Sequence, residues 1–227
     1  MSDTAMLGPM QPAPDAVVFD LDGTLVDTVP ARIVAWAEVL AAADIDVEPG
    51  QLEPTIGMDG RALAREVAAV AGRSLSDAEA EEIDRLAGER FDHHNQAPRP
   101  LPGAREALAR LDAAGVTWAI ATSSRAAQVE ASVRALALGR RPRIVDGSRV
   151  AHAKPAPDLL LLAARELEVE PARTWYVGDS TWDMRAAVAA GMRPLAVLAG
   201  AAVDGEALRD AGAAAVLATL DELDVER

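Results

Sequence analysis

Two carboxylates stand one residue apart at the end of an apolar run. The stretch VVFDLDGT, residues 17–24, delivers Asp20 and Asp22 immediately before Gly23. Alternate residues of a strand face the same side, and glycine lets the chain turn directly afterwards. An ionised carboxylate can attack phosphorus as a nucleophile, while a protonated carboxyl group can give a proton to the leaving oxygen. The alternative is a capped strand followed by an ordinary Asp-Gly turn.

Two distant segments supply groups that suit a phosphate. The stretch AIATSS, residues 119–124, places Thr122 and Ser123 at a second predicted strand end, where hydroxyl and backbone N–H groups can hold phosphoryl oxygens. Lys154, followed by Pro155, carries a point charge that can neutralise a phosphate. Taken singly, each has an ordinary explanation, because such hydroxyls often cap helices and a lone lysine is usually solvated.

A third segment suits a divalent cation. The stretch VGDSTWDM, residues 177–184, carries Asp179 and Asp183 directly after an apolar run. Carboxylate oxygens are hard ligands, and Mg²⁺ typically binds through few of them while it keeps several waters. A turn followed by a helix cap would explain the same two residues without a metal.

The elements that position these residues alternate between strand-like and helical segments. Strands are predicted at residues 16–22, 116–124, 174–180 and 194–200, with a weaker candidate at 141–147, and a helical run at 103–115 ends at Gly115. This alternation predicts an α/β fold with a parallel sheet that is covered by helices on both faces. Such sheets bind ligands outside the carboxyl ends of their strands, which is where the reactive residues fall.

The pattern changes between Asp27 and about Pro98, where helical segments occur without a convincing strand. Residues 30–43 have apolar residues on one face, and residues 76–91 open with Ser76 and Glu79 in capping-box spacing. The proline-rich stretch APRPLPG marks the return to the sheet. We therefore expect a helical domain, residues 27–98, inserted into an α/β core formed by residues 1–26 and 99–227.

In this order and at these strand ends, the segments resemble the four signature motifs of the haloacid dehalogenase superfamily. The motifs are DLDGT, ATSS, the lysine of KPAPD, and GDSTWD, and the resemblance covers nearly the whole chain. It implies a doubly wound, Rossmann-like parallel-sheet core with an inserted α-helical cap, in the branch of phosphoglycolate phosphatases and β-phosphoglucomutases. The predicted insertion after the first motif agrees with that cap position.

The resemblance also implies a role for each motif residue. Asp20 is the expected nucleophile, Asp22 the general acid/base, Thr122 and Ser123 phosphate ligands, Lys154 their charge partner and Thr24 an orienting residue. Mg²⁺ is the expected cofactor, bound by Asp179, the Asp20 carboxylate and the Asp22 backbone carbonyl, with Asp183 behind these ligands.

The same residues exclude two relatives. Haloacid dehalogenases as a family lack the aspartate two positions after the nucleophile, since a halide leaves without a proton, so Asp22 favours phosphoryl transfer. Phosphonatase-type members have alanine there and use a lysine of the cap, whereas residues 27–98 contain no lysine.

Composition and charge exclude several kinds of site and of binding partner. The 227 residues are half hydrophobic, enough to bury a substantial core, and they include no cysteine, which excludes disulfides and thiol nucleophiles. The net charge of -14 argues against nucleic acid or an anionic membrane as a partner. Because no stretch suits a bilayer span or a signal peptide, we expect a cytoplasmic protein.

Substrate selection is expected in the cap, where the sequence is less informative. Arg61, in TIGMDGRALAREV, is the candidate for a substrate carboxylate or a second phosphate, although a solvated helix arginine is the more usual explanation of such a residue. His93 and His94 are adjacent and point in different directions on a helix, so we expect them to be structural. Trp182, inside the fourth motif, is expected to border the site entrance.

The sequence thus predicts a Mg²⁺-dependent phosphatase that hydrolyses a small phosphorylated metabolite, of the phosphoglycolate or sugar-phosphate type, through an aspartyl-phosphate. One alternative is a phosphosugar mutase, which returns the phosphoryl group to its substrate. Another is a non-catalytic protein that keeps the fold; such proteins usually lose a motif residue, and none is missing here. The oligomeric state and the individual metabolite are not indicated.

Overall fold

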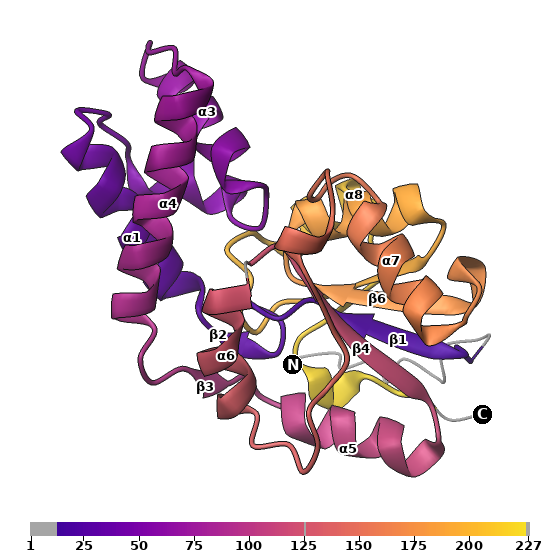
Figure 1. The fold of residues 1–227 in the computed structure, drawn as a ribbon. Coiled ribbons are helices and arrows are strands. Elements are labelled where there is room, and N and C mark those ends of the chain that lie inside the picture. The colour runs from indigo at the N-terminus through magenta and orange to yellow at the C-terminus, as the bar shows by residue number, and fades with distance from the viewer. Residues whose placement is uncertain (1–12, 125, 226–227) are drawn as a thin grey trace, which may run out of the picture.

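A six-stranded sheet with helices on both faces forms the larger part of the molecule, and a group of helices projects from one end of it (Figure 1). The structure, a computed structural model, describes residues 13–124 and 126–225. Of the predicted core segment 1–26, residues 1–12 therefore lie outside the described residues.

The sheet is parallel throughout, in the order β5-β4-β1-β6-β7-β8. Its strands are β1 (Ala16–Phe19), β4 (Thr117–Thr122), β5 (Ile144–Asp146), β6 (Thr174–Gly178), β7 (Arg193–Val197) and β8 (Ala215–Leu217). The chain adds β4 and β5 on one side of β1 and then returns to the other side for β6. The carboxyl ends of these strands around β1 form the switch point at which open α/β sheets bind ligands. The predicted fold class is confirmed, while β8 was not anticipated.

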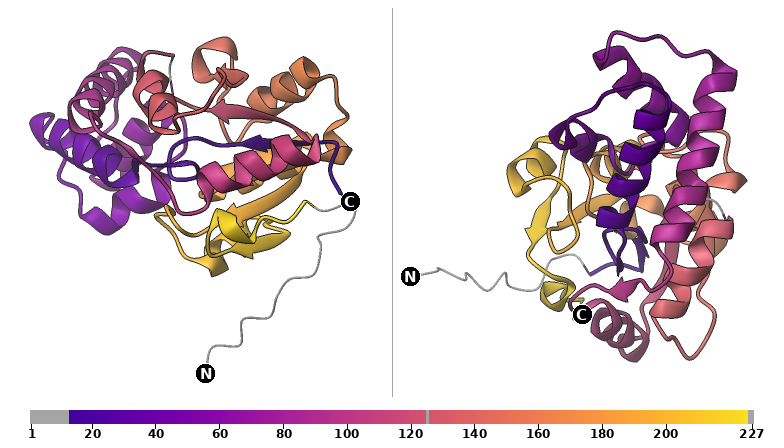
Figure 2. Two further views of the ribbon diagram at one scale, coloured as in Figure 1. Left: turned by 90° about the horizontal axis from the view of Figure 1, so that it is seen from below. Right: turned by 90° about the vertical axis from the view of Figure 1, so that its left-hand side faces the viewer.

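Two helical layers cover the sheet (Figure 2). One face packs on α5 (Ala104–Ala114) and α6 (Ala126–Ala135), and the other on α7 (Asp158–Leu167) and α8 (Thr181–Ala190), with α9 (Gly205–Asp210) beside α8. Short 3₁₀ turns complete the chain: η1 (Glu53–Thr55), η2 (Gly147–Arg149), η3 (Pro171–Arg173) and η4 (Leu220–Glu222). In β1, Val17 and Phe19 face one layer while Ala16 and Val18 face the other, as the two-residue period of a strand requires.

The inserted helices have a buried core of their own. They are α1 (Val29–Ala42), α2 (Pro49–Leu52), α3 (Gly60–Val70) and α4 (Asp77–His94). Trp36, Leu40, Leu63 and Ile83 belong to this cluster, which is distinct from the two clusters against the sheet. The capping box predicted from residues 76–79 begins α4, since the side chain and backbone of Ser76 exchange hydrogen bonds with Glu79.

A two-stranded antiparallel ribbon joins the inserted helices to the sheet. It pairs β2 (Val26–Asp27) with β3 (Arg99–Pro100), so the outgoing and returning chains run side by side. The sequence did not indicate these strands, because two residues are too few to show a period. Among the described residues, no helix combines the length and apolar character needed to cross a bilayer.

Candidate active site

The reactive side chains converge where three neighbouring strands end. Asp20 follows β1, Thr122 ends β4 and Asp179 follows β6, so all three lie at one edge of the sheet. Facing this edge, the inserted helices enclose a cleft of about 280 Å³. Its lining includes core residues Asp20, Asp22, Thr122, Ser123, Lys154 and Asp179, and Arg32, Trp36, Arg61, Asp84, Arg85 and Asp92 from the inserted helices.

Lys154, the only lysine in the sequence, lies at the centre of the site. Its side chain is 1% exposed, and its Nζ lies 2.6 Å from Asp20 Oδ1 and 2.7 Å from Asp183 Oδ1. Burial alone would lower the pKa of Lys154, but the carboxylates of Asp183 and Asp20 outweigh it and raise that pKa. The lysine is therefore a permanent positive charge beside the predicted nucleophile.

Three buried carboxylates surround this one ammonium group. Oxygen atoms of Asp20, Asp179 and Asp183 lie within 4.8 Å of one another. Burial raises the pKa of Asp20 to about 7, with further raising by Asp183 and Asp22 and partial opposition from Lys154. Burial, together with Asp183 and Asp20, also raises the pKa of Asp179. The cluster is short of positive charge and rich in hard oxygen donors, which fits a divalent cation such as Mg²⁺.

The turn after β1 holds Asp179 in this cluster. Thr24 Oγ1 donates a hydrogen bond to Asp179 Oδ1 at 2.8 Å. Gly23 has a φ of +82°, and a Cβ atom there would lie 2.3 Å from Asp179 Oδ2. Only glycine therefore permits both the left-handed turn and the close approach of the carboxylate.

Asp183 anchors Lys154 from below the cleft. Its Oδ1 accepts a hydrogen bond from the Tyr176 hydroxyl at 2.9 Å as well as contacting Lys154, and its Oδ2 accepts from the Ser180 backbone N–H at 3.0 Å. Burial would raise the pKa of Asp183, but Lys154 and these hydrogen bonds outweigh it and lower that pKa. The sequence did not single out Tyr176, because an aromatic residue in a buried strand looks like ordinary packing.

Asp22 has a different set of partners, although only one residue separates it from Asp20. Its Oδ1 accepts from Thr28 Oγ1 at 2.8 Å, and its Oδ2 accepts from Arg32 Nη2 at 3.0 Å and from the Ser124 hydroxyl. The two aspartates thus lie in unlike environments. Asp20 contacts a buried ammonium group, whereas Asp22 accepts hydrogen bonds from two hydroxyls and from an arginine of α1. Sequence reasoning missed Thr28, Arg32 and Ser124.

The end of β4 offers groups for a phosphoryl oxygen. Thr122 Oγ1 accepts a hydrogen bond from the Ser124 backbone N–H at 3.1 Å, which fixes the turn. The Ser123 Oγ atom is buried and has no hydrogen-bond partner within the described part of the chain. Because Ser123 lines the cleft beside Lys154, this hydroxyl fits a phosphoryl oxygen of a bound ligand.

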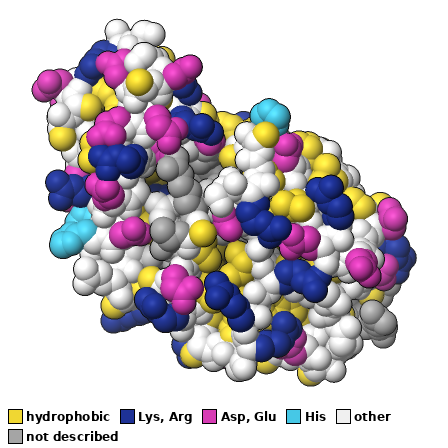
Figure 3. Space-filling view, viewed as in Figure 1, with side chains coloured by type: hydrophobic (Ala, Val, Ile, Leu, Met, Phe, Trp, Pro, Cys, Tyr) yellow, Lys and Arg dark blue, Asp and Glu magenta, His cyan; other side chains and the backbone are white. Residues whose placement is uncertain are grey.

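Arg61 lines the cleft and already has acidic partners. Its guanidinium lies 3.3 Å from Asp59 Oδ2 and 3.6 Å from Glu81 Oε2, and its side chain is 45% exposed. Figure 3 shows charged side chains of both signs mingled over the inserted helices. Arg61 thus lines the cleft, but it is exposed and already paired with two acidic side chains of the inserted segment.

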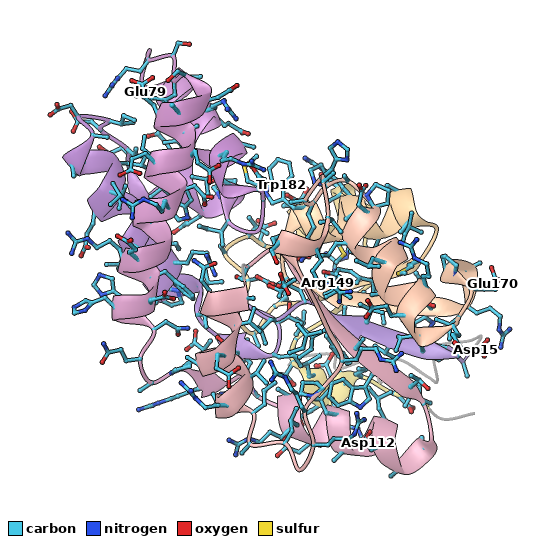
Figure 4. All side chains as sticks on the ribbon, viewed as in Figure 1. Asp15, Glu79, Asp112, Arg149, Glu170 and Trp182 are labelled. Atoms are coloured by element: carbon cyan, nitrogen blue, oxygen red, sulfur yellow. The ribbon has the colours of Figure 1, made fainter. Side chains whose placement is uncertain are left out.

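Trp182, His94 and His152 have hydrogen-bond partners outside the reactive cluster. Trp182 Nε1 donates to the Pro54 backbone carbonyl at 2.9 Å, so this indole links α8 to the inserted segment (Figure 4). His94 Nε2 lies 3.0 Å from Glu38 Oε1, and His152 Nδ1 lies 3.0 Å from Asp158 Oδ1. Neither histidine lines the cleft.

Known proteins are similar to this chain in sequence and in fold. The family model of the haloacid dehalogenase-like hydrolases matches residues 14–191. A phosphoglycolate phosphatase of Mesorhizobium japonicum is 35% identical over 216 residues, which cover 92% of this chain and 93% of the relative. An N-acetylmuramic acid 6-phosphate phosphatase of Pseudomonas aeruginosa is 32% identical over 185 residues, 80% of each chain.

A solved structure of a hydrolase is also similar to this chain in fold. The crystal structure of a hydrolase from Pseudomonas syringae superimposes with a TM-score of 0.86 at 31% identity, and the match covers 92% of this chain and 95% of that one. The matching family model spans all four motifs, and the residues of those motifs meet at one edge of the sheet. The chain therefore belongs to the haloacid dehalogenase-like hydrolases.

Proposed function

We propose that this protein is a Mg²⁺-dependent phosphatase that hydrolyses a small phosphorylated metabolite through an aspartyl-phosphate on Asp20. The observation that carries the proposal is the pair of aspartates with unlike partners, Asp20 against Lys154 and Asp22 against Thr28, Arg32 and Ser124. Phosphoryl transfer to an enzyme carboxylate needs one nucleophile and one proton carrier side by side, and this pair provides both.

In the first half-reaction, an Asp20 oxygen bonds to phosphorus as the phosphorus–ester oxygen bond breaks. The leaving oxygen takes the proton of the Asp22 carboxyl group and departs as an alcohol. Lys154 neutralises negative charge on the nucleophile and the transferring group, while Ser123 and Thr122 hold phosphoryl oxygens.

In the second half-reaction, Asp22 removes a proton from a water molecule that attacks the same phosphorus. The bond between phosphorus and Asp20 breaks, inorganic phosphate forms, and the Asp20 carboxylate is restored. Each carboxylate thus returns to its starting protonation state after one turnover.

The buried carboxylates fit the Mg²⁺ ion that the family resemblance implies. Asp20 and Asp179 would hold it, together with the backbone carbonyl of Asp22, while Asp183 orients Lys154 beside them. A bound divalent cation supplies positive charge that one lysine does not provide for three carboxylates.

We expect Mg²⁺ to stabilise the metal-free protein, because it relieves repulsion among buried carboxylates. At a concentration one hundred times its Kd, the ion contributes about 2.7 kcal/mol, which for a chain of this size raises Tm by roughly 5–10 °C. Thermal unfolding with and without MgCl₂, against NaCl at matched ionic strength, measures this shift. Chelation should remove activity and leave the far-ultraviolet circular dichroism at 25 °C unchanged. A loss of helical signal on chelation would show instead that the metal is structural.

The inserted helices are proposed to act as the substrate-selecting cap. In this division, residues 27–98 form the cap over a core of residues 1–26 and 99–227, and Arg61 contacts the remote end of the substrate. Two relatives are named for the phosphate esters of glycolate and of N-acetylmuramic acid, which supports a small phosphorylated metabolite as the substrate. A cytoplasmic location stays a prediction.

The direct test is a screen of the purified protein against phosphorylated metabolites, with Mg²⁺ and with a chelator. We expect inorganic phosphate to be released from a small set of compounds, phosphoglycolate and sugar phosphates among those tested, only when Mg²⁺ is present. Equal phosphate release in the presence of chelator would overturn the metal-dependent mechanism. Transfer of the phosphoryl group to a second position of a sugar, with no phosphate released, would favour the mutase alternative.

A further inference from the structure

Arg32 extends from α1 to the predicted acid/base. Its Nη2 donates to Asp22 Oδ2 at 3.0 Å and to the Ser124 hydroxyl at 2.9 Å. The side chain is 16% exposed and forms part of the cleft lining. This arginine therefore joins the inserted helices to the strand ends at the position where Asp22 would meet the substrate.

An aromatic ring also contacts the guanidinium. The Arg32 Cζ atom lies 4.0 Å from the ring centroid of Phe91, a residue of α4 that is almost completely buried. Arginine stacks on aromatic faces more readily than lysine does, because its charge is spread over a planar group. The stacked ring and the two hydrogen bonds hold the group in one orientation before a substrate arrives.

The guanidinium keeps hydrogen-bonding capacity for a ligand. An arginine has five N–H donors, and the hydrogen bonds of Arg32 to described residues all run through Nη2. Two acidic side chains lie beside it, since Asp22 is hydrogen-bonded to it and Asp92 on α4 interacts with it electrostatically. Donors at Nε and Nη1 therefore lack acceptors within the described part of the chain.

The position of Asp22 determines which substrate atoms these donors reach. To pass a proton to the leaving oxygen, an Asp22 oxygen must lie within about 2.6–3.2 Å of it. Because Arg32 Nη2 is 3.0 Å from Asp22 Oδ2, the ester carbon and the carbon next to it would come to lie beside the guanidinium. An oxygen on the second carbon of the leaving group is then the natural acceptor.

On the basis of the proposed phosphatase mechanism, we propose that Arg32 is a substrate-binding residue that recognises an oxygen on the carbon next to the ester carbon. The chemical class is a phosphate monoester in which the carbon next to the ester carbon either belongs to a carboxylate or bears a hydroxyl. Arg61, the other arginine considered for the substrate, is exposed and already paired with two acidic side chains of the inserted segment. Arg32 is thus the determinant of the group nearest to the reacting bond.

Three esters of the same carbon chain length test this assignment. Ethyl phosphate has no second oxygen, 2-hydroxyethyl phosphate has a hydroxyl, and phosphoglycolate has a carboxylate. We expect Arg32→Met to lower kcat/KM for at least one of the oxygenated esters by about 10- to 100-fold more than for ethyl phosphate. Arg32→Lys should recover part of this preference, because it keeps the charge and loses the planar fork. The ester with the larger loss identifies the acceptor as the carboxylate or the hydroxyl.

Two controls separate the possible failures. Arg65→Met removes an arginine that is paired with Asp77 on the inserted helices and does not line the cleft, so it should change none of the three rates. An equal loss for all three esters in Arg32→Met, or no loss, would overturn substrate recognition by Arg32. Loss of the aspartyl-phosphate mechanism itself would appear in wild type, as hydrolysis without a covalent phosphoenzyme, and is distinguishable from either result.

Discussion

Replacing Asp20 with asparagine is expected to abolish turnover while the fold is retained. A neutral amide is a poor nucleophile at phosphorus, so we expect kcat to fall by about 10⁴-fold or more. The fold should persist because Lys154 keeps its second partner, Asp183, at 2.7 Å. The effect on turnover is the largest that the proposed mechanism predicts for one side chain.

The same substitution should not destabilise the metal-free protein at neutral pH. The folded-state pKa of Asp20, about 7, lies above its ordinary value of 3.8. Ionisation of this carboxyl group therefore opposes folding, and the opposition grows as pH rises from about 4 through 7. Asparagine cannot ionise, so the Tm of the variant at pH 8 is expected to equal or exceed that of the metal-free wild type.

Activity and thermal unfolding of Asp20→Asn are best compared with Asp15→Asn. Asp15 precedes the opposite end of β1 and pairs with Arg173, far from the cleft (Figure 4). This control removes an aspartate of the same segment and should keep wild-type turnover. Phosphatase activity in a preparation of Asp20→Asn free of wild-type enzyme would refute the assignment of the nucleophile.

Asp22→Asn is expected to separate the two half-reactions. An asparagine cannot give a proton to the leaving oxygen, so unactivated metabolite esters should be hydrolysed about 10²- to 10⁴-fold more slowly. An aryl phosphate has a leaving group that needs little protonation, and its first step should be far less affected. Because water is no longer activated, the phosphorylated Asp20 should accumulate with the aryl substrate.

Rapid-mixing kinetics and intact-protein mass spectrometry measure this separation. With p-nitrophenyl phosphate, we expect a burst of nitrophenol close to one equivalent, followed by slow turnover, and a protein heavier by one phosphoryl group. Thr28→Val is the matched variant, because it removes one hydrogen bond to Asp22 and leaves the carboxylate in place. If Asp22→Asn slows aryl and alkyl esters by the same factor and no covalent species forms, Asp22 is not the acid/base.

The arrangement of the motifs was predictable because it depends on local patterns. Apolar runs that end in polar residues identified β1, β4 and β6, and parallel strands bring such ends to one edge. The match to the family model and the similar solved structure confirm the predicted family and fold class. The two-residue strands β2 and β3 were missed because so short a segment shows no alternation.

The partners of Asp22 were not predictable in the same way. Arg32 lies ten residues after Asp22 on a largely apolar helix whose only other charged residue is Glu38, and nothing local distinguishes it from a solvated arginine. Its role becomes visible only when the insertion folds back over the sheet and places it on Phe91 and Ser124. The turn before Arg61 predicted a substrate-binding arginine, but the sequence does not show that Arg61 pairs with Asp59 and Glu81.

The ribbon formed by β2 and β3 has a consequence for how this enzyme can be rebuilt. Because Val26 pairs with Pro100 and Asp27 with Arg99, the chain leaves and re-enters the sheet domain at adjacent points. Helical modules of other sizes can be grafted between these points without lengthening any core connection, as insertions at closely spaced ends are generally tolerated. Such a graft would nevertheless remove Thr28 and Arg32, which lie just beyond the ribbon and bind Asp22. The inserted helices can therefore be exchanged without disrupting the fold of the core, but the exchange would remove residues that bind the acid/base.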